Sequence, residues 1–118
     1  MLAKVHHIAS LRPGWNGPKS KTPSKEALRN AERLIELIST LEESSSETQL
    51  PDIGPMTDGG VAFEWAGSDS KGRELVIFIH PKPPLEFAAV DERNDYELSG
   101  ETNTVEELLP NLKWVLES

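Results

Sequence analysis

The chain has 118 residues, a formal net charge of −8 and no cysteine. This length fits a single domain covering residues 1–118, and the absence of a long apolar run excludes a membrane-spanning helix. Without cysteine the chain cannot form disulfides, zinc–thiolate sites or thiol nucleophiles, so we expect a cytoplasmic protein.

The charge is distributed unevenly along the chain. Residues 1–41 hold seven Lys/Arg and three Asp/Glu, whereas residues 42–118 hold five Lys/Arg and seventeen Asp/Glu. Within residues 91–107 there are seven carboxylates and a single cation, Arg93. Such a field steers partners and keeps a protein soluble without choosing its fold. Because the two halves are complementary in charge, a homo-oligomer is among the expected states.

A short first helix is predicted at the start of the chain. Leu2, Val5, Ile8 and Leu11 recur every three residues, which indicates one apolar stripe. This helix ends before Pro13, because the residue that precedes a proline is disfavoured in the α region.

A long amphipathic helix is predicted from Thr22 to about Glu42. Thr22 fits an N-cap, and Pro23 fits the first helical position, where no N–H is needed. At 100° per residue, one arc of this helix collects apolar residues, namely Leu28, Ala31, Leu34, Ile35, Ile38 and Leu41.

An antiparallel sheet of three to five strands is predicted after a polar, mobile linker at residues 42–50. Residues 51–56 contain two prolines, so a strand there belongs at a sheet edge. Asp58-Gly59 favours a two-residue hairpin turn with both residues at positive φ. Residues 61–65, 73–80 and 85–90 are the clear strands. The second is apolar on both faces over residues 75–79, which favours a central strand covered on at least most of both sides. Tyr96 and Leu98 indicate a short edge piece.

The chain ends in a predicted helix. Thr104 and Glu107 fit a capping box, and Pro110 requires a kink or a restart inside this helix. Sheet and helices each have one apolar side to bury, so the expected fold is α+β: a small antiparallel sheet packed against an N-terminal helical pair and a C-terminal helix.

No motif for catalysis, a metal or a cofactor is found. His6 and His7 are neighbours and point about 100° apart on a helix, which does not suit one metal ion. Gly59-Gly60 has no Lys-Ser/Thr pair after it and precedes a strand, so it is not a phosphate loop. We therefore expect no cofactor and no metal, and the sequence favours a non-enzymatic role.

The first candidate contact site is the loop that joins the two N-terminal helices. It contains Arg12, Trp15 and Asn16 among glycines and prolines. Trp15 has two interpretations: a plug over the junction of the helices, or an exposed aromatic anchor for a protein or a nucleobase.

The second candidate contact site is the acidic run at residues 91–107, with Asp91, Glu92, Asp95 and Glu97 as its contact residues. One interpretation is a solvated loop and edge that discourages strand-to-strand aggregation. The other is a decoy, in which the carboxylates occupy the Lys/Arg surface that a nucleic-acid-binding partner uses for phosphates.

Two short motifs suggest a family. The loop GWNG and the hairpin segment TDGGVAFEW, followed by RELVIFI, resemble an uncharacterised family of small bacterial proteins with a GWDG-like loop and a DGGVxLEW-like hairpin. The resemblance spans about residues 8–91, and Asn16 stands where that family tends to have Asp. It implies a bacterial or mobile-element origin and supports the hairpin, and it supplies no activity.

Together these features predict a small acidic binding protein of the antitoxin, immunity or defence-inhibitor type. Its expected partner is a protein, with a basic nucleic-acid-binding protein as one candidate, and no membrane is involved. Two alternatives stay open: a small enzyme or ligand-binding domain with a pocket between sheet and helices, and nucleic-acid binding through the basic N-terminal segment.

Overall fold

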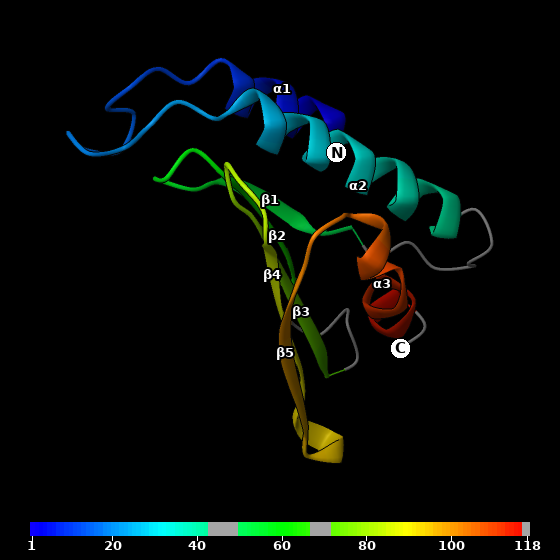
Figure 1. Ribbon diagram of the computed structural model, residues 1–118. Helices are drawn as coiled ribbons and strands as arrows, with labels where there is room; N and C mark the ends of the chain where they lie inside the picture. Colours follow the sequence, from blue (N-terminus) through cyan, green and yellow to red (C-terminus); the bar gives the residue numbers. More distant parts are fainter. Residues whose placement is uncertain (43–49, 67–71, 117–118) are drawn as a thin grey trace.

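The computed structural model describes residues 1–42, 50–66 and 72–116. Two N-terminal helices precede a five-stranded antiparallel sheet and a C-terminal helix, which confirms the expected α+β class (Figure 1). In chain order the elements are α1 (Leu2–Ala9), α2 (Lys25–Glu42), β1 (Asp52–Pro55), β2 (Val61–Trp65), β3 (Arg73–Ile79), β4 (Leu85–Asp91), η2 (Glu92–Asn94), β5 (Tyr96–Thr102), η3 (Glu106–Leu108) and α3 (Leu109–Leu116). The linker predicted at 42–50 lies, apart from its two end residues, outside the described residues.

The sheet is a meander in which each strand pairs with the next one along the chain. Its order is β1-β2-β3-β4-β5, so β3 is the central strand, as predicted. β1 is an edge strand, as its prolines require. The predicted short edge piece is a full seven-residue strand, β5, which forms the opposite edge. Residues 96–102 of the acidic run at 91–107 thus form an edge strand.

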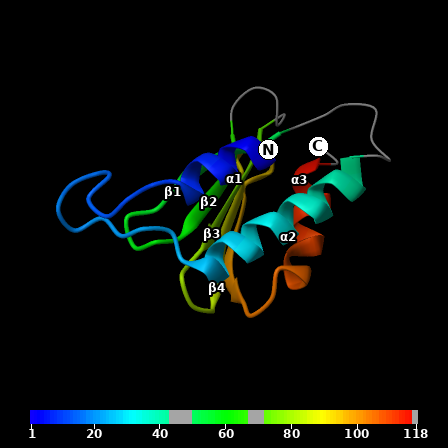
Figure 2. The same ribbon diagram turned by 90° about the horizontal axis from the view of Figure 1, so that it is seen from above.

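The hydrophobic core lies between one face of the sheet and the helices. In Figures 1 and 2, α1 runs beside α2, α2 crosses over the sheet, and α3 packs on the same side. The strands contribute alternate residues to this core, and α2 contributes one side of its surface. The largest fully buried side chains are Phe63, Ile8, Leu34, Ile38, Leu75, Ile77, Ile79, Leu108, Leu112, Val5, Val61 and Val105.

The start of α2 differs from its prediction. The helix begins at Lys25, and Ser24 is its N-cap because the Ser24 hydroxyl accepts the Ala27 N–H at 3.0 Å. Thr22 does not take this role because residues 21–24 lie along the 57–59 turn. Lys21 N–H donates to the Thr57 carbonyl and Ser24 N–H to the Gly59 carbonyl, each at 2.9 Å.

The β1–β2 turn also differs from its prediction. Met56 N–H donates to the Gly60 carbonyl and Gly59 N–H donates to the Met56 carbonyl, both at 3.0 Å. Gly59 has φ +94°, whereas Asp58 does not have a positive φ. The connection is therefore a three-residue loop with glycine in the left-handed position. Asp58 stabilises it by accepting the Gly60 N–H at 2.9 Å.

The last helix restarts near its proline, as predicted. A 3₁₀ turn, η3, leads into α3, and Pro110 lies in the first turn of α3, where its missing N–H costs no hydrogen bond. The predicted capping box does not cap this turn. Thr104 and Glu107 instead hydrogen-bond each other through their side chains at 3.2 Å.

Candidate interaction surface

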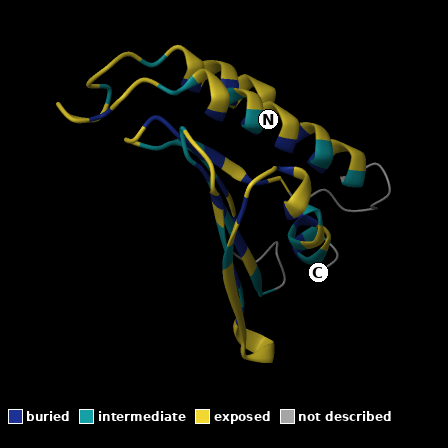
Figure 3. Ribbon diagram, viewed as in Figure 1, coloured by how far each residue is buried: buried dark blue, intermediate teal, exposed yellow. Residues whose placement is uncertain are grey.

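One face of the sheet carries no helix. Figure 1 shows α1, α2 and α3 on the same side of the strands, and buried positions alternate with less buried ones along β2 and β3 (Figure 3). We call the opposite side the bare face. The prediction that β3 is covered on at least most of both sides is wrong for the bare face, since Val76 and Phe78 are only half-buried there and Glu74 is exposed. Within residues 1–42, 50–66 and 72–116, neighbouring strands shield these side chains, because α1, α2 and α3 lie on the other face.

The centre of the bare face is apolar. Strand register places Ala62 beside Phe78 and Val76 beside Ala88. Val90 extends this strip, and each of the five residues is half-buried. A contiguous apolar strip on a sheet surface is the kind of feature that marks interaction sites on soluble proteins.

Carboxylates surround this apolar centre. No outward-facing position of the five strands holds Lys or Arg, while six hold an acid: Asp52, Glu64, Glu74, Glu86, Glu97 and Glu101. Two pairs face each other directly across neighbouring strands, Asp52 with Glu64 and Glu86 with Glu101. Directly opposed like charges destabilise a sheet, and Lys4 beside Asp52 and His80 beside Glu86 offset part of this repulsion.

His80 lies where β3 ends and joins three segments of the sheet. Its Nδ1 lies 3.0 Å from Asp58 Oδ2 and its Nε2 lies 2.7 Å from Glu86 Oε1. The protonated ring donates to both carboxylates. The hydrogen bond to Asp58 raises the pKa of His80 above 6.5; burial opposes this rise, and Glu86 reinforces it. When it is protonated, His80 is a local cation that partly neutralises the acids at this end of the bare face.

The predicted contact loop, residues 10–24, projects from the body of the protein (Figure 1). Trp15 is half-buried, and its Nε1–H donates to the Lys21 carbonyl at 2.9 Å. It is not among the hydrophobic residues packed on the core, so it is neither the plug nor a fully exposed anchor. Asn16 is exposed and its N–H donates to the Ser20 hydroxyl at 2.9 Å, while Arg12 is exposed.

The structure separates the predicted acidic residues into three places. Asp91 is buried, with 4% of its surface exposed, and lies 3.6 Å from Arg73 Nε. It accepts the Asn94 side-chain amide at 2.8 Å, and this bond lowers the pKa of Asp91 most, followed by backbone hydrogen bonds and the Arg73 charge. Glu92 and Asp95 lie at the β4–β5 tip, and Glu97 belongs to the bare face.

These placements divide the predicted site. Asp91 has a structural environment and is not available as a surface contact. Figure 1 shows the contact loop and the β4–β5 tip far apart, so Trp15 and Asp95 do not form one site. Glu97 alone among the predicted residues joins the carboxylates of the bare face.

Sequence reasoning missed most of the bare face. Glu64, Glu74 and Glu86 lie outside the predicted acidic run and were missed because they are far apart in the chain, whereas Glu101 lies within the run and was not named as a contact residue. The available signal was the alternation within each strand, which puts acids on the side opposite the bulky apolar residues. Pairing that pattern across consecutive strands would have gathered them on one surface.

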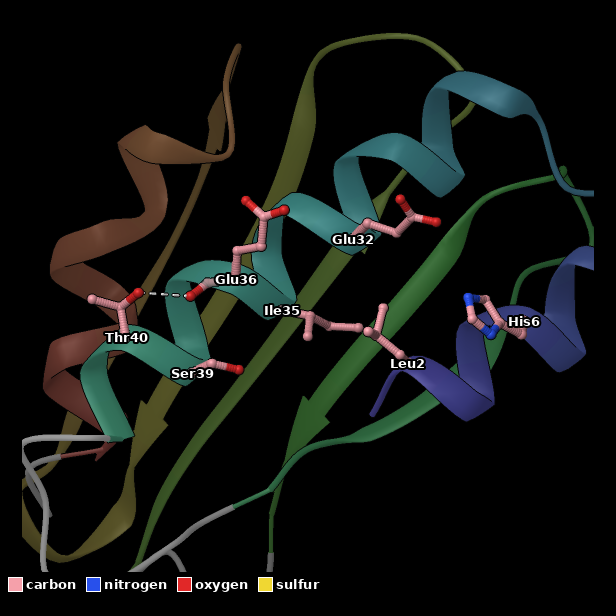
Figure 4. A pocket seen from close by; sticks show the side chains of 7 residues that line it. All are labelled: Leu2, His6, Glu32, Ile35, Glu36, Ser39 and Thr40. Atoms are coloured by element: carbon pink, nitrogen blue, oxygen red, sulfur yellow. Dashed lines mark hydrogen bonds between the residues drawn. The ribbon is translucent and has the colours of Figure 1, made fainter.

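A groove between α1 and α2 is a candidate small-molecule site (Figure 4). It has a volume of about 510 Å³ and is lined by Leu2, His6, Glu32, Ile35, Glu36, Ser39 and Thr40. Leu2 and Ile35 point toward each other, whereas the Glu36 carboxylate points away from Leu2. The Thr40 hydroxyl donates to the Glu36 backbone carbonyl at 2.9 Å. The polar groups do not converge on a common point, as a small-molecule site needs.

Comparison with known proteins adds no function. No protein-family model, no curated protein and no solved structure matches the chain. The resemblance to small bacterial proteins therefore stays a prediction. Within residues 1–42, 50–66 and 72–116, no three His, Asp or Glu side chains gather as a metal site, and no helix is long and apolar enough to span a membrane.

Proposed function

We propose that the protein is a non-enzymatic binding protein that contacts a basic macromolecule with the bare face of its sheet. One observation carries this proposal: a sheet face without a helix over it, with an apolar centre and acids but no Lys or Arg at its outward positions. An apolar centre surrounded by charged residues is typical of a protein interface.

The negative charge of the bare face favours a partner with a positively charged surface. Glu64, Glu74, Glu97 and Glu101 form no ion pair within the described part of the chain. Their charge is therefore available to a partner, and it supports fast association with a positive surface and rejects acidic ones. A Lys/Arg surface that normally holds phosphates is such a partner, and this supports the proposal of an antitoxin, an immunity protein or a defence inhibitor.

The test is charge reversal on the bare face with a matched control elsewhere. Glu64→Lys/Glu74→Lys changes the net charge by +4 on the bare face, and Glu32→Lys/Glu36→Lys makes the same change on the exposed side of α2. Immobilised wild-type protein and the α2 variant should capture the same basic protein from an extract of the native cells. The bare-face variant should lose it.

Two results contradict the proposal. A partner retained equally by both variants uses another surface. A partner lost equally by both responds to net charge alone. Circular dichroism of each variant confirms that the comparison is made between folded proteins.

A second candidate function follows from the loop at residues 10–24. Arg12, Lys19 and Lys21 are exposed there and form no ion pair with any described residue, beside the half-buried Trp15. This arrangement suits contact with nucleic-acid phosphates. Retention on DNA or RNA that falls steeply with salt supports it, and no retention at about 50 mM salt removes it.

A further inference from the structure

The two edges of the sheet differ in how they are closed. β1 has only four residues, ends at Pro55 and follows Pro51. Proline offers no N–H to an incoming strand. In addition, α1 packs beside β1, and Lys4 lies 3.8 Å from Asp52 at its first residue. Proteins commonly block edge strands by such means, so β1 is a closed edge.

β5 has none of these features. It is seven residues long, contains no proline and pairs only with β4. Most of its residues are exposed. One row of its backbone N–H and C=O groups therefore faces solvent along the whole strand, which is the template that an added strand uses.

The side chains of β5 offer different chemistry on its two sides. On the bare face, Glu97 and Glu101 are separated by one outward position, Ser99, and both are exposed. On the other side, Tyr96 is 40% exposed and Leu98 is 43% exposed. Both are large hydrophobic residues that the α3 helix leaves partly open to water.

Gly100 enlarges the apolar side. A Cβ at this position would lie 3.0 Å from the Phe87 ring, so the ring lies directly over the glycine. Phe87 is half-buried and borders Leu98 through the register of β4 and β5. An incoming side chain opposite Gly100 would therefore meet this aromatic ring.

We propose that β5 is the docking edge for an extended segment of the basic partner, which adds a sixth strand to the sheet. This inference rests on the proposed function and names the recognised sequence. A residue opposite each of Glu97 and Glu101 is Lys or Arg, and residues opposite Leu98 and Gly100 are apolar, because opposed residues lie about 4.5–5.5 Å apart. The recognised pattern is basic–apolar–any–apolar–basic.

A second copy of this chain is a poor occupant of the same edge. Antiparallel pairing of two β5 strands centred on Ser99 places Glu97 of one chain opposite Glu101 of the other, twice in the dimer. Each chain also carries a net charge of −8. Such like-charge juxtaposition is costly at an interface, whereas a basic strand gains two charge pairs.

The test uses two synthetic peptides of equal composition and the full-length, isotope-labelled protein. The ordered probe contains Lys-Val-Ser-Val-Lys within an acetylated, amidated nonapeptide that has threonine at the remaining positions. The reordered probe contains Lys-Lys-Val-Val-Ser in the same frame. We expect the ordered probe to bind about tenfold more tightly and to slow amide hydrogen exchange at residues 96–102.

Two variants of the protein distinguish recognition of the β5 edge from a general effect of net charge. Glu97→Lys/Glu101→Lys should weaken binding of the ordered probe at least about tenfold. The control, Glu32→Lys/Glu36→Lys on α2, has the same charge change and the same separation of four residues along the chain, and it should leave binding unchanged. Both pairs are exposed, so neither is expected to unfold the protein.

Three outcomes overturn the inference and are distinguishable. If both peptides bind equally and shift Val76 and Phe78 without protecting β5 amides, the bare face binds and the edge does not, so the proposed function survives alone. If neither peptide binds at about 50 mM salt, the docking inference fails, and the capture experiment with Glu64→Lys/Glu74→Lys decides the proposed function. If sedimentation shows a dimer that Glu97→Lys/Glu101→Lys abolishes, the occupant is a second copy.

Discussion

The two faces of the sheet are built from alternate residues of the same strands and have opposite environments. On the helix side, Phe63 and Ile77 are fully buried; on the bare face, their chain neighbours Glu64 and Phe78 are exposed and half-buried. A single step along a strand changes the face. The comparison teaches that an apolar run such as β3 shows where a strand lies in a sheet and not how many of its sides are covered.

The largest expected difference between the two faces is in stability. Phe63→Ala removes a fully buried ring and should lower the free energy of unfolding by about 3–5 kcal/mol. Phe78→Ala removes a half-buried ring from the adjacent strand and should cost about 1 kcal/mol, within the usual range for point substitutions. Urea denaturation followed by circular dichroism measures both values.

Equal losses would contradict the assignment of a bare face. They would mean that Phe78 is as well packed as Phe63, and therefore that something covers this side in solution. The comparison is clearest if the two variants lose different amounts of unfolding free energy while the dependence of that free energy on urea concentration stays as in the wild type. This dependence follows the surface exposed on unfolding, so an unchanged value shows that the folded state is as compact as before.

The sequence predicted the helices and strands more fully than the contacts that each of them makes with the rest of the fold. The stripe of α2, the strand at 61–65 and the central position of β3 followed from periodicity and composition. The cap at Ser24 did not, because the 57–59 turn holds residues 21–24 through backbone hydrogen bonds formed across the fold. Local rules favoured Thr22-Pro23, and a tertiary contact outweighed them.

The candidate site was predictable only in part, for the same reason. The acidic run was visible as a segment, but its residues do not share one surface. Asp91 turns inward to Arg73 and Asn94, and Glu97 turns outward. Strand alternation could have separated these two, had the register of β5 been known. The register depends on the β4–β5 connection, and no turn motif in the sequence predicts how that connection is formed.

The next prediction compares these two acids directly. Asp91→Asn should destabilise the protein, because it removes the charge that faces Arg73, whereas Glu97→Gln should change stability little. The folded pKa of Asp91 is lowered, so its contribution is present above the ordinary value of 3.8 and is lost as the pH falls through the folded value. Thermal denaturation from pH 7 to pH 2 should show the Asp91→Asn deficit shrinking below about pH 4. A deficit that stays constant with pH contradicts the charge interaction.

A smaller effect is expected at His80. Because its folded pKa is raised, its contribution is fully present below 6.5 and is lost as the pH rises through the folded value. The wild type should therefore lose up to about 1 kcal/mol above pH 6.5, the usual limit for an exposed ion pair. His80→Gln should show no such loss, and NMR titration of the ring measures the pKa itself. An equal loss in both proteins would assign it to another group.

The smallest expected effect is a gain in stability. It tests whether the carboxylates of the bare face lower the stability of the free protein while they contribute to binding. Glu101→Gln removes the repulsion from Glu86 directly across the strand pair and should stabilise the protein by about 0.2–1 kcal/mol. Glu97→Gln is the control, because Val90 lies opposite it and no like charge is relieved. The gain should shrink in high salt, which screens exposed charges. Both variants should bind the ordered basic peptide more weakly, so Glu101→Gln alone gains stability while it loses affinity. If Glu101→Gln gains no stability at low salt, the opposed carboxylates do not repel in the free protein, and the relief of that repulsion cannot contribute to binding.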